Sequence, residues 1–210
     1  MTEKPAKQKI VAVVGPTASG KTSLSIKLAK QFAGEVISAD SRQIYRGLDI
    51  GTGKVTEAEM QGVPHHILDI RDPNESYSAF EFGEDARAAI QEIAARAHLP
   101  IIAGGTFFYL QALLHPDSLP QVGASPERRS ELEAMTISEL VEILEAIDPE
   151  RATVVDQANP RRLVRSIEIA EALGQVPAVT ESPSLFNTLI IGIQTDKEIL
   201  RENFRRRGES

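Results

Sequence analysis

This sequence of 210 residues contains no cysteine, so neither a disulfide framework nor a thiolate metal site can form. It also lacks any apolar run close to the ~20 residues that a membrane-spanning helix needs. The basic N-terminal segment MTEKPAKQK is followed by only a short apolar stretch at residues 10–14, which does not fit a secretion signal. We therefore expect a cytoplasmic protein that does not associate with a membrane.

Positive charge is also in short supply, because the formal net charge is −7. This balance argues against a protein that coats nucleic acid in general. The charge is segregated along the chain: residues 127–150 hold eight acidic and two basic side chains, whereas arginines gather at 161–165 and 201–207. The acidic run is most simply a solvated helix face, and the arginines leave room for a local basic groove.

Residues 10–22, IVAVVGPTASGKT, are the stretch around which the chain is organised. Five apolar residues run into the spacing G-x-x-x-x-G-K-T, the phosphate-loop pattern. Its glycines let the backbone turn tightly around an anion, and the helix that follows directs the positive end of its dipole to the same place. Lys21 adds a full positive charge, and the Thr22 hydroxyl can hold a magnesium ion. The sequence therefore predicts a site for a di- or triphosphate, with the candidate ligands Gly15, Pro16, Thr17, Ala18, Ser19, Gly20, Lys21 and Thr22.

Strand and helix patterns alternate along the first half of the chain. After the first helix, EVISAD predicts a buried strand that ends at Asp40, and LPIIAGG predicts another that ends before Thr106. Between them, Ser78 with Glu81 three residues later forms a capping box that predicts the start of a long helix. This order indicates an α/β fold, an open parallel sheet of the P-loop NTPase type flanked by helices, with ligands at the carboxyl ends of the strands. Gly15, Asp40 and Thr106 should then converge on one crevice.

The second half of the chain predicts a small helical insertion. Residues 115–125 have the prolines and glycine of a linker, Pro126 begins a helical stretch, and a further helix should start at Asn159-Pro160 and stop at Gly174. We expect residues 1–114 to form the first part of the core, 115–158 the helical insertion, and 159–210 the return to the core.

Several motifs in this order resemble the tRNA dimethylallyltransferases, also called isopentenylpyrophosphate tRNA transferases. They are GPTASGKT, ISADSRQIYRGLDIGTGK, GVPHHILDIRDPNESYSAFEF and LPIIAGGT-x-x-YLQALL, followed by DPERA and NPRRLVRSIEIAEALG. The resemblance covers roughly residues 9–205. It implies that the last segment is shorter at its C-terminal end than in the family.

The resemblance implies transfer of the dimethylallyl group from its diphosphate to the N6 amine of the adenine on the 3′ side of the anticodon (position 37), in tRNAs that read codons starting with U. The phosphate loop would hold the donor diphosphate, with Mg²⁺ on Thr22. Asp40 and Thr106 would be catalytic, with Asp40 accepting the proton of the attacking amine. The expected partners are the tRNA anticodon stem-loop and dimethylallyl diphosphate, and the chain is expected to be a monomer. The tRNA-contacting residues would be Asp40, Ser41, Arg42, Gln43, Thr106, Arg161, Arg162, Leu163, Val164 and Arg165.

Some of these residues have simpler interpretations. Asp40 could instead be a ligand of magnesium or water, or a helix cap. His65 and His66 suggest a metal, but no partner stands at ligand spacing, so no zinc site is expected. Lys54 either touches phosphate or is a solvated loop lysine. Asp69 either holds a loop or binds the magnesium, and the structural role is the expected one.

The aromatic run after Thr106 and the arginines also allow two interpretations. Phe107, Phe108 and Tyr109 are expected in the core rather than in a platform for bases. Arg162 and Arg165 could bind the donor diphosphate instead of tRNA.

Three other functions are compatible with the same motifs. They are dimethylallyl transfer to a free adenine nucleotide, phosphoryl transfer by a small-molecule P-loop kinase, and diphosphate or RNA binding without turnover. The arginines at 161–165 favour tRNA as the acceptor. Retention of Lys21, Thr22, Asp40 and Thr106 argues against a protein that only binds.

Overall fold

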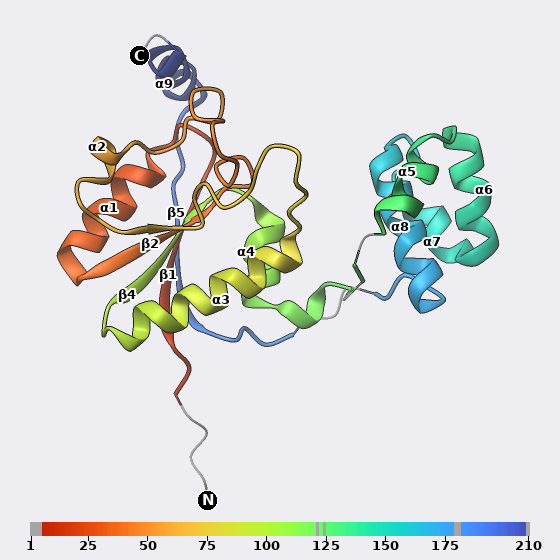
Figure 1. The fold of residues 1–210 in the computed structure, drawn as a ribbon, viewed down its shortest axis with the longest axis horizontal. Coiled ribbons are helices and arrows are strands. Elements are labelled where there is room, and N and C mark those ends of the chain that lie inside the picture. The colour runs from red at the N-terminus through yellow and green to blue at the C-terminus, as the bar shows by residue number, and fades with distance from the viewer. Residues whose placement is uncertain (1–5, 121, 124, 179–181, 209–210) are drawn as a thin grey trace, which may run out of the picture. The chain divides into compact units, whose positions relative to one another are not determined.

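The computed structural model describes residues 6–120, 122–123, 125–178 and 182–208 (Figure 1). These residues form two compact units. The first comprises the described residues up to 116 together with those from 182 onwards, and the second comprises those between 117 and 178.

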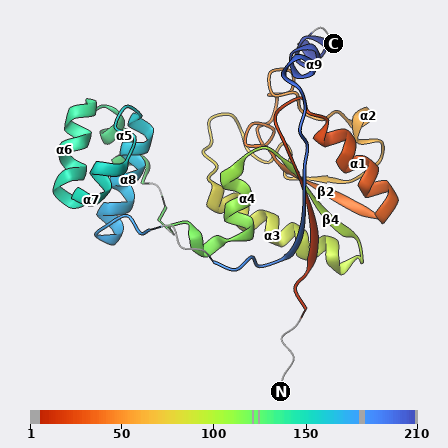
Figure 2. The ribbon, with the colours of Figure 1, turned by 180° about the vertical axis from the view of Figure 1, so that it is seen from behind.

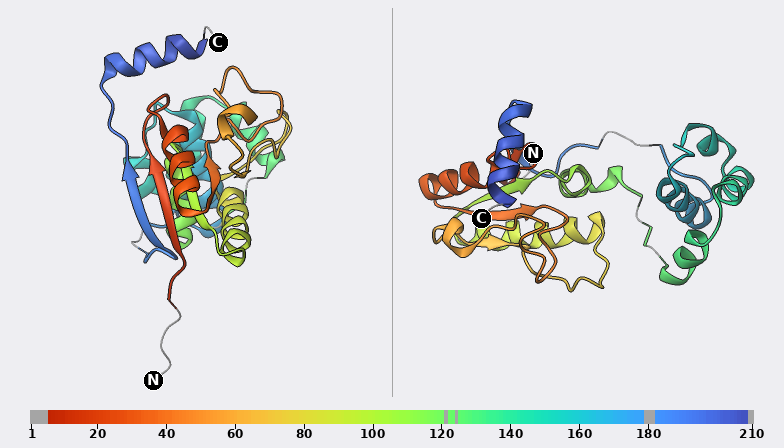
Figure 3. Two further views of the ribbon diagram at one scale, coloured as in Figure 1. Left: turned by 90° about the vertical axis from the view of Figure 1, so that its left-hand side faces the viewer. Right: turned by 90° about the horizontal axis from the view of Figure 1, so that it is seen from above.

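The first unit is built on a parallel sheet with the strand order β3-β2-β4-β1-β5. Its strands are β1 (Lys9–Val14), β2 (Gly34–Ala39), β3 (His65–His66), β4 (Leu99–Gly104) and β5 (Asn187–Gly192). β5 runs beside β1 although it follows it by more than 170 residues in the chain (Figure 3, left). The predicted open parallel α/β sheet is confirmed. β3 is shorter than the HHILDI segment predicts, because the left-handed backbone at Ile67 and Asp69 ends the pairing.

Helices cover both faces of this sheet (Figures 1 and 3). The helices of the first unit are α1 (Lys21–Phe32), α2 (Glu57–Met60), α3 (Ala79–Ala95), α4 (Phe107–Leu114) and α9 (Lys197–Gly208). Ile26 and Ala29 of α1 pack with Val36 and Ile101 on one face. α3 and α4 pack against the alternate strand residues on the other face, in a cluster that contains Ile37 and Ile102. The strands β1, β2 and β4 therefore bury side chains on both sides, as parallel strands between helices do. β5 differs, because Leu189 and Ile190 are 60% and 59% exposed.

α3 begins where the sequence predicts. The Ser78 hydroxyl accepts a hydrogen bond from the Glu81 N–H at 3.2 Å, and the Glu81 carboxylate accepts one from the Ser78 N–H at 2.8 Å. This reciprocal pair satisfies two backbone donors that a helix start would otherwise leave unpaired. The cap thus sets the register of the helix that supports the end of the sheet bearing Thr106.

The register of three strands brings their carboxyl ends to one level. Gly104 of β4 lies opposite Val14 of β1 on one side and Ala39 of β2 on the other. The residues that follow, Gly15 and Asp40 among them, therefore leave the sheet at the same edge. The convergence predicted from the order of the strands follows from this register.

Gly104 is required for this register, because a Cβ at this position would lie 2.1 Å from the Ala39 carbonyl oxygen. We expect Gly104→Ala to lower the free energy of unfolding by about 3 kcal/mol, the upper part of the usual range for overpacking, since the obstacle is backbone of a neighbouring strand. The matched control is Gly51→Ala, where an added Cβ would meet no atom within 4 Å. Urea unfolding of both variants checks the prediction, and equal stability of the two would contradict it.

A buried carboxylate ties the opposite end of the sheet together. Glu35 of β2 is 3% exposed and accepts hydrogen bonds from Arg96 at 2.8 and 3.0 Å, with His66 and His98 each 2.7 Å away. The hydrogen bonds from Arg96, opposed by burial and aided by the two histidines, lower the pKa of Glu35 from 4.5 to about 2. His66 of β3 thus links that strand to Glu35 of β2. The described residues contain no group of three or more acidic or histidine side chains that could hold a metal ion.

This shift makes part of the stability acid-sensitive. Because the pKa of Glu35 is lower in the folded than in the unfolded chain, its contribution is complete above about pH 4.5 and is lost as the pH falls towards 2. We expect Glu35→Gln to lose on the order of 2 kcal/mol at pH 7, after allowance for the solvent exposure of Arg96 and His98, and to lose less further stability than the wild type on acidification. Unfolding measured from pH 7 to pH 3 checks this. Parallel pH curves for the two proteins would contradict it.

The second unit is a bundle of four helices around its own apolar core. They are α5 (Pro126–Glu133), α6 (Ile137–Ile147), α7 (Pro149–Val154) and α8 (Pro160–Leu173), after the short 3₁₀ turn Pro116–Ser118. α8 is capped by Asn159 and ends at Gly174 in the left-handed conformation, as predicted. The predicted return to the core at residue 159 differs from the structure, in which the helical unit continues to α8. The physical reason is that Leu163 and Ile167 of α8 complete the core formed by Leu140 and Leu144.

The acidic side chains of residues 127–150 are exposed, as expected, except Asp148, which is 7% exposed and accepts a hydrogen bond from the Arg151 N–H. Arg129 forms a paired hydrogen bond with the buried carboxylate of Glu168 at 2.7 and 2.8 Å, and Arg128 pairs with Glu171 at 2.6 Å. Both bases of the acidic segment thus join α5 to α8. Among the described helices, none has both the length and the apolarity to cross a membrane.

Candidate functional site

The phosphate loop connects β1 to α1. At Gly15, a Cβ would lie 2.9 Å from both the Ile193 carbonyl oxygen and the Ser19 Oγ, so only glycine fits there. Gly20 precedes α1 with φ +91°, a left-handed conformation that glycine adopts at little cost. Because Gly20 has no side chain, the N-terminus of α1 is not capped by one and remains open towards an anion.

Two polar side chains of this loop are arranged for a ligand. The Lys21 Nζ donates a hydrogen bond to the Pro16 carbonyl at 2.8 Å, which holds the ammonium group over the loop. The Ser19 hydroxyl is shielded from solvent and has no hydrogen-bond partner among the described residues. A shielded hydroxyl without a partner costs free energy unless a ligand pairs with it. The donor chemistry of the loop, an ammonium, a hydroxyl and a helix N-terminus, fits a diphosphate.

Thr22 is the residue through which the chain would hold a metal ion at this loop. It lies in the first turn of α1, half-buried, and its carbonyl accepts a hydrogen bond from Ser25 at 2.9 Å. One protein hydroxyl is a sparse ligand set, but Mg²⁺ is commonly held by phosphate oxygens and water with few protein ligands. The residues present therefore fit a magnesium ion that arrives with the diphosphate.

Asp40 stands at the end of β2 in a tight turn. Its Oδ1 accepts a hydrogen bond from the Arg42 N–H at 3.0 Å, and its carbonyl accepts one from the Gln43 N–H at 3.2 Å. The Oδ2 atom accepts no hydrogen bond from the described residues, and the residue is half-buried. One carboxylate oxygen thus orients the group while the other is free to take a proton.

Thr106 is joined to the residue after Asp40. Its Oγ1 accepts a hydrogen bond from the Ser41 N–H at 3.1 Å, and its own N–H donates to the Ala39 carbonyl at 3.3 Å. The hydroxyl also lies 3.4 Å from the Ser41 hydroxyl. The structure therefore brings Thr106 and the turn at 40–43 together.

The turn and the phosphate loop meet at Gly105. A Cβ on Gly105 would lie 3.1 Å from the Gly15 carbonyl oxygen and 3.9 Å from the Lys21 Nζ. Since Thr106 is the next residue, the phosphate loop and the Asp40 turn border one site. The predicted ligands 15–22 and the predicted residues at 40–43 and 106 are thus assembled within the first unit.

Tyr109, three residues after Thr106, packs in the core of the first unit. It is 4% exposed, and its ring stacks on Phe82 with centroids 4.3 Å apart. Burial, followed by the nearby charges of Tyr45 and Asp40, raises the pKa of Tyr109 well above its ordinary value. Tyr109 therefore lies in the core as predicted and stays neutral.

Phe107 and Phe108 do not lie in the core, and the prediction was wrong for them. They are 69% and 61% exposed. The physical reason is that Tyr109 stacks on Phe82 of α3 within the core cluster, whereas the rings of Phe107 and Phe108 lie outside that cluster and contact each other.

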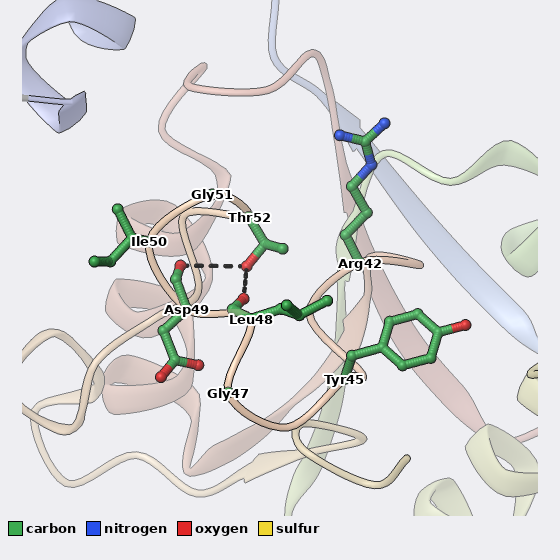
Figure 4. Close-up of a pocket in the computed structure, with 8 residues that line it drawn as sticks. All are labelled: Arg42, Tyr45, Gly47, Leu48, Asp49, Ile50, Gly51 and Thr52. Atoms are coloured by element: carbon green, nitrogen blue, oxygen red, sulfur yellow. Dashed lines mark hydrogen bonds between the residues drawn. The ribbon is translucent and has the colours of Figure 1, made fainter. Parts of the chain in front are cut away.

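A polar loop beyond Asp40 encloses a hollow of about 570 Å³ (Figure 4). The Thr52 hydroxyl donates to the Leu48 carbonyl at 2.5 Å and lies 3.3 Å from that of Asp49, which closes the loop on itself. Ile50 at its tip is 92% exposed and points away from the loop in Figure 4. No motif in the sequence predicts this hollow, because the glycines and polar residues that form it are typical of any turn. Its lining residues are Arg42, Tyr45, Gly47, Leu48, Asp49, Ile50, Gly51 and Thr52.

Lys54 closes this loop rather than binding phosphate or facing solvent. Its side chain is 5% exposed, and its Nζ donates to Asp49 at 2.6 Å, Asp69 at 2.5 Å and the Tyr45 carbonyl at 2.7 Å. Burial alone lowers the pKa of Lys54, but the two carboxylates outweigh it and leave the pKa raised. Both interpretations of Lys54 were wrong, and the structural role expected for Asp69 is confirmed.

A residue far along the sequence also touches the phosphate loop. Asn203 of α9 donates a hydrogen bond from its amide to the Ala18 carbonyl at 3.0 Å. Figures 1 and 2 show α9 on the side of the sheet where the phosphate loop lies. No spacing pattern in the sequence pointed to this contact, because the two residues are 185 positions apart.

The predicted tRNA-contacting arginines belong to the second unit. Arg161 and Arg162 are exposed, and Arg162 lies 3.3 Å from Asp156. Arg165 donates to the Val122 carbonyl at 2.9 Å and to Glu168 at 3.2 Å. Leu163 and Val164 are 0% and 3% exposed in the core of that unit, so their side chains are not available to tRNA.

This chain is similar to known proteins of one family. The family model described as IPP transferase matches residues 43–210. The tRNA dimethylallyltransferase of Halalkalibacterium halodurans is 43% identical over 210 residues, which cover 96% of this chain and 67% of that protein.

Two solved structures agree with the sequence comparison. The crystal structure of the full-length tRNA isopentenylpyrophosphate transferase from Bacillus halodurans is 42% identical with a TM-score of 0.63, covering 96% of this chain and 65% of that one. A eukaryotic dimethylallyltransferase acting on tRNA is 30% identical with a TM-score of 0.76, covering 95% and 52%. The chain thus spans about two thirds of the length of its bacterial relatives.

A parallel sheet with a phosphate loop after its first strand and an aspartate after its second defines a P-loop-type α/β protein that binds a phosphorylated substrate. The chain belongs to the IPP transferase family. The predicted family, whose members are named as enzymes that modify tRNA by dimethylallyl transfer, is confirmed.

Proposed function

We propose that this chain transfers the dimethylallyl group from dimethylallyl diphosphate to the exocyclic N6 amine of an adenine in tRNA, the one on the 3′ side of the anticodon (position 37). The observation that carries the proposal is the placement of the Asp40 carboxylate at the strand edge that also bears the phosphate loop. One site would thereby combine a phosphate loop that binds the diphosphate with a carboxylate that accepts a proton from the incoming nucleophile. Relatives named for this activity support it. The acceptor would be a tRNA that reads codons starting with U, and the chain would act as a monomer in the cytoplasm.

The phosphate loop would bind the leaving group. As the bond between the dimethylallyl carbon and the diphosphate oxygen breaks, the diphosphate departs with the electron pair and its negative charge grows. Lys21, the Ser19 hydroxyl and the N-terminus of α1 stabilise that charge more strongly in the transition state than in the bound donor. A magnesium ion held by Thr22 would supply further charge neutralisation to the same diphosphate.

Asp40 would serve the acceptor. The N6 nitrogen forms the new bond to the dimethylallyl carbon and gives up a proton, which the free Oδ2 of Asp40 accepts. Because Oδ1 is held by the Arg42 N–H, the carboxylate is pre-oriented for this transfer. Thr106, through its bond to Ser41, would hold the Asp40 turn against the donor site.

The tRNA would contact both units. Ser41, Arg42 and Gln43 follow Asp40 and would meet the nucleotides around the reacting adenine. Arg161, Arg162 and Arg165 would meet the phosphate backbone. The adenine must leave its stack to reach Asp40, and this costs least in a single-stranded loop.

The wild-type chain tests the proposal directly. It would be incubated with magnesium, radiolabelled dimethylallyl diphosphate, and unmodified tRNA or AMP as the acceptor. Label in tRNA but not in AMP is the expected result. Label in AMP alone would favour the nucleotide-acceptor enzyme, and ATP-dependent phosphorylation of a small molecule would favour a kinase. Donor binding without transfer to either acceptor would contradict the proposal.

A further inference from the structure

Phe107 and Phe108 form an exposed aromatic pair at the start of α4. Their rings are arranged edge to face, with centroids 5.7 Å apart and planes at 73°. With 69% and 61% of their surfaces in solvent, they differ sharply from Tyr109, the next residue, which is 4% exposed. Two adjacent phenylalanines left in water constitute an apolar patch that is unfavourable unless a partner covers it.

The aromatic pair lies next to the candidate site in the chain. Phe107 directly follows Thr106, whose hydroxyl accepts the Ser41 N–H. Gly105, two residues before Phe107, borders the phosphate loop and Lys21. The aromatic pair therefore stands at the rim of the site, and the hydrogen bond that orients the Asp40 carboxylate comes from the Arg42 N–H rather than from α4.

The chemistry of the rim favours one occupant. Arg42 is exposed and offers a positive charge for phosphate oxygens. The residue before it, Ser41, is hydrogen-bonded to Thr106, the residue before Phe107, so the turn that carries the charge is joined to the start of α4. A flat aromatic surface next to a cation is the arrangement that binds unpaired nucleotides, which stack a base on the ring and place a phosphate on the charge. An apolar protein partner would make no use of Arg42.

We propose that Phe107 and Phe108 form a stacking platform for an unpaired base of the acceptor RNA, a base that neighbours the reacting adenine in the anticodon loop. This inference rests on the proposed function, which it deepens by naming the residues that hold the loop open. Stacking on the platform keeps the neighbouring base in place while the adenine leaves the stack for Asp40. The two phenylalanines are thus positioning residues for the acceptor.

The test compares aromatic with aliphatic side chains at the two positions. Phe107→Leu with Phe108→Leu keeps an apolar surface but removes the rings, Phe107→Tyr with Phe108→Tyr keeps the rings, and Phe32→Leu replaces an exposed phenylalanine of α1. An anticodon stem-loop RNA carrying 2-aminopurine next to the target adenine reports stacking, because its fluorescence falls when it stacks on a ring.

The expected results separate stacking from a structural role. The double leucine variant should bind the RNA about tenfold more weakly, raise the KM for RNA but not for the donor, and lose the fluorescence quenching. The double tyrosine variant and Phe32→Leu should retain wild-type affinity and quenching.

Other outcomes would overturn the inference. A double leucine variant that binds RNA within twofold of the wild type, with the same quenching, would show that the rings do not stack on a base, while wild-type transfer to tRNA would leave the proposed function standing. Self-association of the wild type that the double leucine variant lacks, with RNA binding unchanged, would identify the pair as a protein contact. A wild type that neither binds nor prenylates tRNA would overturn both proposals.

Discussion

Replacing Asp40 by asparagine is expected to lower kcat for prenyl transfer by about 10²- to 10⁴-fold, the usual contribution of a positioned general base. Asparagine keeps an oxygen that can accept the Arg42 N–H, so the turn at the end of β2 is retained. What it loses is the second carboxylate oxygen, which is free of hydrogen bonds from the described residues. The loss should therefore fall on kcat, with the KM of the donor nearly unchanged. Steady-state assays with saturating tRNA measure it.

The control for this substitution is Asp40→Ala, which removes the turn hydrogen bond as well. If Asp40 acts only as a cap, the alanine variant should lose stability and activity together and the asparagine variant should lose neither. If it acts as the base, both variants should be inactive and only the alanine variant should unfold more readily. Full activity of Asp40→Asn would refute the assignment of Asp40 as the base.

Loss of the Lys21 ammonium is expected to have the other large effect. Lys21→Ala should reduce kcat/KM by about 10²- to 10³-fold, because the charge acts where negative charge develops on the leaving diphosphate. It should also weaken inhibition by inorganic diphosphate, a readout that depends on the loop alone and not on the acceptor. The Kd of tRNA should change little.

Lys27→Ala is the matched control for Lys21→Ala. Both lysines lie on α1, but Lys27 is exposed towards solvent. Comparable losses of diphosphate inhibition in the two variants would indicate a general charge effect and contradict a specific role of Lys21. Thermal unfolding of Lys21→Ala should be compared as well, because the Lys21 ammonium also holds the Pro16 carbonyl.

Much of the fold could be predicted because it rests on local rules. The capping box at Ser78 and Glu81, the stop at Gly174 and the apolar runs of the strands each act within a few residues. The predicted domain boundary at residue 159 was wrong because it depends on long-range packing rather than on local rules. The apolar face of α8 indicates that it packs against something, but periodicity does not reveal whether the partner is the sheet or α5 and α6.

The features of the site also divide into those that depend on local sequence and those that depend on tertiary packing. The phosphate loop and Asp40 could be predicted because a motif places its ligands within a few residues, and parallel strands bring their ends to one edge. The role of Lys54 could not, since its partners Asp49 and Asp69 become neighbours only when the loop between 45 and 69 closes. Phe107 and Phe108 were misplaced because an apolar side chain in a helix predicts burial unless the position of that helix relative to the sheet is known.

By itself, the sequence determined the class of the protein, the phosphate loop and the position of Asp40 at the end of a strand, because each depends on short-range spacing and on the order of strands. Only the tertiary structure decided which side chains are available to a substrate. It buried Leu163, Val164 and Lys54, exposed Phe107 and Phe108, and joined Asn203 to Ala18 across 185 positions. The physical reason is that exposure and long-range contact depend on the packing of whole elements against one another, which no local pattern specifies.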